Sequence, residues 1–166
     1  MLKNKYAAWS AVLIWMGIIF YFSHQPADQS ENYSSSILVY VSVLADFFYP
    51  FRIEEEALHL FIRKAAHVLV YFVLGVLTYH ALLRSGNPLK TAGIYALAVC
   101  FFYAVSDEVH QLFIPGRSGE VSDVLLDTTG AAGGIACIYL FNHLRDKRNK
   151  SKKERLRERK NAGETT

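Results

Sequence analysis

The sequence predicts an all-α membrane protein, a bundle of four transmembrane helices, on two observations. First, 52% of the 166 residues are hydrophobic and 20% are charged, and the two classes are segregated into uncharged apolar blocks and short charged connectors. A soluble domain would interleave them at the period of its helices or strands. Second, lysine and arginine concentrate on alternate connectors, as they do in proteins that cross a membrane several times.

Four apolar blocks are near the minimum length of a span, about 17 to 20 residues. They cover residues 6–22, 65–83, 91–106 and 124–141. The first block follows Lys3 and Lys5, but no small-x-small cleavage site comes after it, so we expect an uncleaved span. Residues 1–141 are therefore expected to form the transmembrane domain.

A fifth apolar stretch, Ile37 to Phe51, is short for a span and contains Asp46 and Pro50. We expect it to form an interfacial or re-entrant helix on the extracytoplasmic side, between the first two spans. Glu54 to Glu56 then suit the acidic first turn of a helix that continues into the second span.

The distribution of charge predicts the orientation. With four spans and the amino end inside, segments 1–5, 84–90 and 142–166 hold fourteen Lys/Arg and the outer segments hold four, as the positive-inside rule requires. Both termini are therefore expected in the cytoplasm. The basic tail, 142–166, has ten Lys/Arg and four Asp/Glu but no aromatic residue, which argues against a nucleic-acid partner.

In this topology the unusual polar residues gather at the outer face. They are Ser23 and Gln25 after the first span, Arg63, Lys64 and His67 near the start of the second, Asp107, Glu108 and Gln111 after the third, and Arg117, Asp123 and Asp127 around the start of the fourth. Lys64, His67 and Tyr71 recur at steps of three and four, so they share a helix face that should face protein. Gly130 and Gly134 remove the side chains that would keep a neighbouring helix away.

Asp127 is the most informative single residue. A carboxylate inside a span costs roughly 2.5 kcal/mol at the membrane centre and less near its edge, so it needs a counter-ion or a proton. Candidate partners are Lys64, Arg63, Arg117 and His67. The alternative to a functional group is a structural ion pair that fixes helix register.

The segment from Asp107 to Gln111 carries two acids and an imidazole. On a continuing helix Asp107 shares a face with Gln111, while Glu108 points about 100 degrees away, so one acid is expected to face the bundle alone. The two-histidine zinc pattern with a central Glu is missing. We expect no metal and no cofactor.

A turn at Pro115-Gly116-Arg117 holds an arginine that is able to fork onto a phosphate or a carboxylate. Together with Arg63 and Lys64, it supplies more positive charge than Asp127 alone would need. This surplus favours an anionic head group as ligand.

These motifs, taken in order, resemble the VanZ-like family. The pattern is Phe22-Ser23-x-Gln25, Arg63-Lys64-x-x-His67 with Tyr71 and Gly75, Asp107-Glu108-x-x-Gln111, Pro115-Gly116-Arg117, and Asp123 before a glycine-rich span. Each motif alone is weak, but their joint occurrence is specific. The similarity covers roughly residues 6 to 141 and leaves out the basic tail.

The resemblance implies a multi-pass protein of the bacterial plasma membrane, in a family named for lowering susceptibility to glycopeptide antibiotics of the teicoplanin type. It implies that the family's signature positions are Lys64, His67, Asp107, Glu108, Gln111, Arg117 and Asp123. Asp127 departs from the family pattern, in which Asn is more usual. Whether its charge or its hydrogen bonds matter is therefore left open.

Three functions remain open. The favoured one binds or modifies an anionic envelope component at the outer face, either a lipid-linked wall precursor or a lipid head group. The second is a membrane hydrolase or transferase, with Glu108 or His67 as general base, Asp123 as a further catalytic residue, and Lys64 and Arg117 holding a phosphate. The third is a non-catalytic structural or partner-binding subunit. The oligomeric state is also left open.

Overall fold

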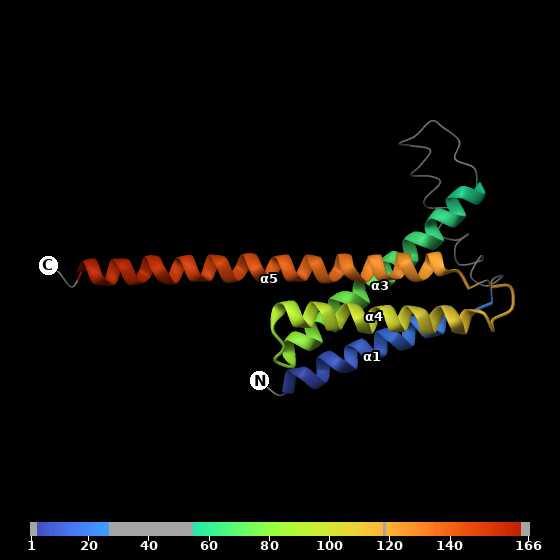
Figure 1. Ribbon diagram of the computed structural model, residues 1–166, viewed down its shortest axis with the longest axis horizontal. Helices are drawn as coiled ribbons and strands as arrows, with labels where there is room; N and C mark the ends of the chain where they lie inside the picture. Colours follow the sequence, from blue (N-terminus) through green and yellow to red (C-terminus); the bar gives the residue numbers. More distant parts are fainter. Residues whose placement is uncertain (1–2, 27–54, 118, 164–166) are drawn as a thin grey trace.

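The computed structural model describes residues 3–26, 55–117 and 119–163. This part of the chain has no strand, and its helices are α1 (Lys3–Ser23), α3 (Glu55–Arg84), α4 (Leu89–Gln111) and α5 (Val121–Gly163) (Figure 1). The predicted all-α fold is confirmed. The interfacial helix expected over Ile37 to Phe51 lies outside the described residues.

Each of these helices contains a segment long and apolar enough to cross a membrane. The segments are Lys5–Ser23, Leu60–Arg84, Leu89–Gln111 and Val121–Glu154. Large apolar side chains point outward, and Leu13, Phe102 and Leu125 are 66%, 69% and 63% exposed. Such surfaces suit contact with lipid and would be a liability in water.

The helix α3 is central, because it contacts α1, α4 and α5. It begins at Glu55, before its apolar segment starts at Leu60, as the acidic first turn predicts. A tight turn with Gly86 at φ +94° connects α3 to α4, a conformation that favours glycine. Trp9 Nε1 of α1 donates to Ser85 Oγ in this turn at 3.1 Å, so α1 and α3 run in opposite directions.

Helices α3 and α5 approach backbone to backbone. A Cβ on Gly130 would overlap the carbonyl group of Val68, and one on Gly134 would overlap that of Phe72. A Cβ on Gly75 of α3 would likewise overlap the backbone of Ala131 on α5. The close packing predicted from Gly130 and Gly134 is therefore confirmed, and it places Asp127, one turn earlier on α5, against α3.

The helix α1 is held by hydrogen bonds to two neighbours. Trp15 Nε1 donates to the carbonyl oxygen of Val70 on α3 at 3.0 Å, and the Tyr103 hydroxyl of α4 donates to that of Met16 at 2.6 Å. In a low-dielectric membrane interior, such polar contacts fix how the helices pack. The first bond joins α1 to α3 and the second joins α1 to α4, so together they hold α1 in the bundle.

The basic segment after residue 141 continues α5, which has 43 residues and so a length of about 64 Å. Figure 1 shows α5 extending well beyond the other helices. No Gly or Pro occurs from residue 135 to 162, so nothing in the sequence ends the helix where the apolar block ends.

Candidate functional site

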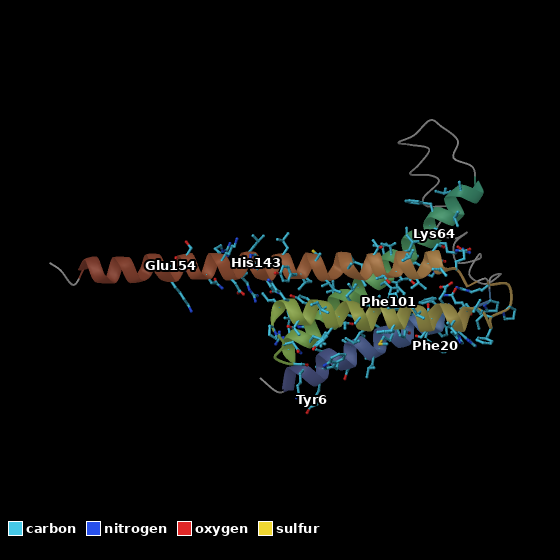
Figure 2. All side chains as sticks on the ribbon, in the orientation of Figure 1. Tyr6, Phe20, Lys64, Phe101, His143 and Glu154 are labelled. Carbon is cyan, nitrogen blue, oxygen red and sulfur yellow. The ribbon has the colours of Figure 1, made fainter. Side chains whose placement is uncertain are left out.

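The polar residues selected from the sequence meet at one end of the bundle, where α1 and α4 end and α5 begins. In Figure 2, Phe20 and Lys64 lie toward this end and Tyr6 toward the opposite one. We call the group the polar cluster: Ser23, Gln25, Arg63, Lys64, His67, Tyr71, Asp107, Glu108, Gln111, Arg117, Glu120, Asp123 and Asp127. Its members come from all the described helices, from the residues directly after α1, and from the loop between α4 and α5.

A lysine ion pair and a histidine–carboxylate contact within the polar cluster join α3 to α5. Lys64 Nζ lies 2.8 Å from Asp123 Oδ1 and 3.8 Å from Glu120 Oε2. His67 Nδ1 lies 3.2 Å from Asp127 Oδ1, and Asp127 is fully buried. Of the four candidate partners of Asp127, the structure therefore selects His67. Lys64 is held by two other acids and is not a free cation.

The Asp127 pair gives a test of charge against hydrogen bonding. Asp127→Asn should cost little stability, because the amide oxygen is able to accept from His67 Nδ1. Asp127→Ala should lower the free energy of unfolding by about 2 kcal/mol, since it leaves the His67 ring without an acceptor. Thermal unfolding in detergent measures both. Equal losses would show that the charge itself is required, and no loss in Asp127→Ala would show that the pair is dispensable.

Both acids at the end of α4 are buried. Asp107 is 4% exposed and Glu108 is 6% exposed, so the expectation that only one of them faces the bundle is wrong. The loop after α4 folds back over Glu108, whose carboxylate accepts a hydrogen bond from the backbone N–H of Glu120, directly before α5. Helix amino ends attract negative charge. Asp107 instead accepts from Gln111 Nε2 at 3.3 Å.

Arg117 reaches the end of α1. Gly116, at φ +77°, turns the chain so that the guanidinium meets two backbone carbonyl oxygens. Nε donates to that of Gln25 at 2.9 Å and Nη2 to that of Phe22 at 3.2 Å, while Nη1 donates to Gln111 Oε1 at 3.4 Å. Arg117 thus caps carbonyl groups that a helix end leaves without intrahelical partners.

The capping contacts do not pair the Arg117 guanidinium with a carboxylate, although Asp107 and Glu108 lie near enough to act on its charge. Within the described residues, neither Arg117 nor Arg63 forms an ion pair with a carboxylate. Partial burial lowers the pKa of the Arg117 guanidinium below its ordinary value, but arginine remains protonated in proteins. Two cations at this end are therefore available to an anion.

A cavity of about 340 Å³ lies between α1 and α3 beside these arginines, within the size range of small-molecule sites. Its walls are mostly apolar, and include Trp15, Ile18, Phe22, Ile62, Ala66 and Val70. Its polar lining comes from the polar cluster, namely Ser23, Gln25, Arg63, His67, Tyr71, Asp107, Gln111 and Arg117. The cavity therefore has an apolar body and a polar, positively charged part.

The cavity divides the residues selected from the sequence. Six of the expected ligand-binding residues line it, namely Ser23, Gln25, Arg63, Asp107, Gln111 and Arg117. Lys64 and Asp127 do not, since both are used in pairs between α3 and α5. Among the expected catalytic residues only His67 lines the cavity, while Glu108 and Asp123 lie outside its lining.

Some residues at this end of the bundle were not predicted from the sequence as site residues. Tyr71 was not selected as a site residue, although it continues the stripe of Lys64 and His67. The rings of His24 and His110 stack, with Nδ1 of the first 3.2 Å from Nε2 of the second. No spacing in the sequence indicates this pair, because it depends on how the ends of α1 and α4 meet.

Comparison with known families agrees with the motifs. The family model described as VanZ/LLP1 matches residues 8–142, most of the chain. The chain belongs to the VanZ/LLP1 family. The resemblance read from the motifs is confirmed. Since the described part of the chain holds four candidate spans, the VanZ/LLP1 chain is a multi-pass membrane protein. Membership ties it to glycopeptide resistance only in general terms. No curated protein and no solved structure matches it significantly.

Proposed function

We propose that this VanZ/LLP1 protein lies in the bacterial plasma membrane with its polar cluster at the outer face, and binds an anionic envelope lipid there. The ligand is a membrane lipid or a lipid-linked wall precursor. The cavity between α1 and α3 carries the proposal, because it combines apolar walls with two arginines that have no carboxylate partner in the described chain. Binding such a lipid at the cell surface is a physical event through which a member of this family could affect susceptibility to glycopeptides.

The shape of the cavity fits an amphiphile. Trp15 and Val70 offer an apolar surface to a hydrocarbon chain. Arg63 and Arg117 line the same cavity and supply positive charge for a phosphate attached to that chain. Guanidinium groups bind phosphate in a fork with two parallel hydrogen bonds. Arg63 is exposed, so it is accessible to a head group without a change in the bundle.

The same geometry favours binding over catalysis. Glu108, the first candidate for a general base, has one oxygen on the Glu120 N–H and does not line the cavity. Asp123 is held by Lys64. A general base must lie within hydrogen-bond reach of the proton that it removes, and neither acid meets a ligand in this cavity. Both instead support the packing of α3, α5 and the connecting loop. His67 is the one candidate base that lines the cavity, and its Nδ1 is already paired with Asp127.

The proposal predicts selective binding of anionic lipid. Purified full-length protein in a neutral detergent is titrated with dioleoyl phosphatidylglycerol or dioleoyl phosphatidylcholine, and native mass spectrometry gives the Kd for each. We expect phosphatidylglycerol to bind at least about tenfold more tightly, since a charge-assisted hydrogen bond contributes about 1.5 to 3 kcal/mol. Arg63→Gln should remove most of this preference.

Arg84→Gln is the matched control. It makes the same substitution in the same helix, in the last turn of α3 at the opposite end of the bundle, and it should leave the preference unchanged. Equal binding of the two lipids by the unmodified protein would contradict the proposed function. So would an equal loss in Arg63→Gln and Arg84→Gln, which would indicate attraction to net charge alone.

A further inference from the structure

The cavity contains buried polar atoms that the described chain does not satisfy. Ser23 Oγ, the Tyr71 hydroxyl and Asp107 Oδ1 make no hydrogen bond of good geometry with the described residues, although the Ser23 hydroxyl lies near enough to the Asp107 carboxylate to interact with it. All three residues line the cavity. Ser23, Tyr71 and Asp107 are 4%, 1% and 4% exposed. Buried polar groups are nearly always hydrogen-bonded in native proteins, so this set indicates a ligand.

The three atoms differ in what they require. The hydroxyls of Ser23 and Tyr71 are able to donate, and Arg63 and Arg117 donate as well, so a phosphate that only accepts would suit these four residues. Asp107 Oδ1 is different, because an ionised carboxylate only accepts. Its other oxygen already accepts from Gln111.

A bare phosphate would therefore fit this cavity poorly. A phosphate that accepts from the Ser23 and Tyr71 hydroxyls would draw the Ser23 proton away from Asp107 and leave Asp107 Oδ1 without a donor. It would also add a second negative charge close to that carboxylate, at a cost that is large in a low-dielectric site. Burying an acceptor without a hydrogen bond costs about 1 to 3 kcal/mol. A ligand that brings its own donor avoids this cost.

From this imbalance, and resting on the proposed function, we infer that the bound lipid carries a hydroxyl-bearing group on its phosphate, and that Asp107 accepts a hydrogen bond from that hydroxyl. The phosphate lies with Arg63 and Arg117, and the hydrocarbon chain follows the apolar walls toward Trp15. The ligand class is thus a phosphodiester lipid with a polyol or sugar head group. Asp107 selects for the hydroxyl and the arginines select for the charge.

The other unsatisfied acids serve as a contrast. Glu108 Oε2 and Asp127 Oδ2 also lack partners among the described residues, but neither Glu108 nor Asp127 lines the cavity. A head group in the cavity would therefore select through Asp107 alone. A variant of Asp107 should therefore change ligand selection, whereas a variant of Asp127 should not. Comparing the two distinguishes a ligand contact from a general effect of buried charge.

Two lipids of equal charge and equal chains test the inference. Dioleoyl phosphatidylglycerol has two hydroxyl groups on its head group, and dioleoyl phosphatidylmethanol has none. We expect the full-length protein to bind phosphatidylglycerol about tenfold more tightly, the value of one hydrogen bond to a charged acceptor. In Asp107→Leu the ratio should fall to near one, with the affinity for phosphatidylmethanol kept or increased because a negative charge is removed.

Asp127→Asn is the control variant and should keep the tenfold ratio. Retained binding of phosphatidylmethanol by Asp107→Leu shows that the variant is folded. Equal affinities in the unmodified protein would overturn the inference, and so would an unchanged ratio in Asp107→Leu or an equal loss of both lipids. If both anionic lipids bind more tightly than phosphatidylcholine but equally, only this inference fails. If neither does, the proposed function fails as well.

Two sources supply this head-group chemistry, and a competition arm separates them. Bound phosphatidylglycerol is challenged with a polyprenyl phosphate that carries a sugar, and in parallel with a glycerophospholipid that carries inositol. Stronger displacement by the polyprenyl compound assigns the cavity to wall precursors, and stronger displacement by the inositol lipid assigns it to membrane lipids. Either result supports the shared chemistry, and displacement by neither contradicts it.

Discussion

Gly134→Ala is expected to destabilise the bundle by about 2 kcal/mol, while Gly133→Ala, one residue earlier, is expected to be neutral or slightly stabilising. A Cβ at position 134 would overlap the Phe72 carbonyl group of α3, whereas one at position 133 would make an ordinary contact with the Phe72 ring at 3.6 Å. Overpacking a close interface typically costs 1 to 3 kcal/mol. Ala in place of Gly otherwise favours a helix by up to about 1 kcal/mol.

Thermal unfolding in detergent, followed by circular dichroism, measures the two variants under one protocol. The pair is well matched, because it makes the same substitution at adjacent residues of α5. A similar unfolding temperature for both would contradict the close approach of α3 and α5. Gly134→Ala should also weaken lipid binding, since the position of α3 sets one wall of the cavity.

The helices α1, α3, α4 and α5, and the faces on which α3 and α5 meet, could be predicted from the sequence. Apolar blocks of span length leave the chain few folds other than membrane helices. The stripe from Lys64 to Tyr71, and the glycines at 130 and 134, marked the faces of α3 and α5 that meet. These predictions hold because they depend on helix periodicity, a local property of the sequence.

The outcome at Glu108 shows where periodicity is insufficient. Helix phase gives the direction of its side chain relative to Asp107, but not what lies in that direction. The loop after α4 returns across Glu108 and brings the Glu120 N–H to its carboxylate. Burial of Glu108 is therefore a property of the loop path, which the sequence does not specify through any spacing.

Arg117 gives a second example. Its turn was predicted from Pro115 and Gly116, and its part in anion binding remains a proposal. Its actual partners include the backbone carbonyl oxygens of Phe22 and Gln25, and backbone acceptors have no signature in side-chain patterns. The cavity beside it was equally hidden, because α1 is apolar around its circumference and gives no sign of which face is partly uncovered.

Lys64 shows how pairing changes a charge count. The sequence presents Lys64, Arg63 and Arg117 as three cations facing one intramembrane acid. In the structure Lys64 is neutralised by Asp123 and Glu120, so the case for an anionic ligand rests on the two arginines and the cavity between α1 and α3. The pairs of Lys64 with Asp123 and of His67 with Asp127 instead stabilise the contact between α3 and α5, and α3 carries Arg63.

Everything proposed for the polar cluster requires that it face the cell exterior, and accessibility of single cysteines to an impermeant reagent tests this directly. The background has Cys100→Ala and Cys137→Ala, which removes both native thiols. Phe113→Cys places a thiol in the loop after α4, at a position that is 79% exposed. Lys90→Cys places one at the opposite end of α4, where the side chain is also exposed.

In intact cells, a membrane-impermeant maleimide should label Phe113→Cys fully and leave Lys90→Cys unlabelled until the membrane is broken. The positive-inside bias predicts this orientation, because Arg84, Lys90 and the basic end of α5 then lie in the cytoplasm. Labelling of Lys90→Cys in intact cells, with Phe113→Cys protected until lysis, would contradict the proposed function and the ligand inferred from it.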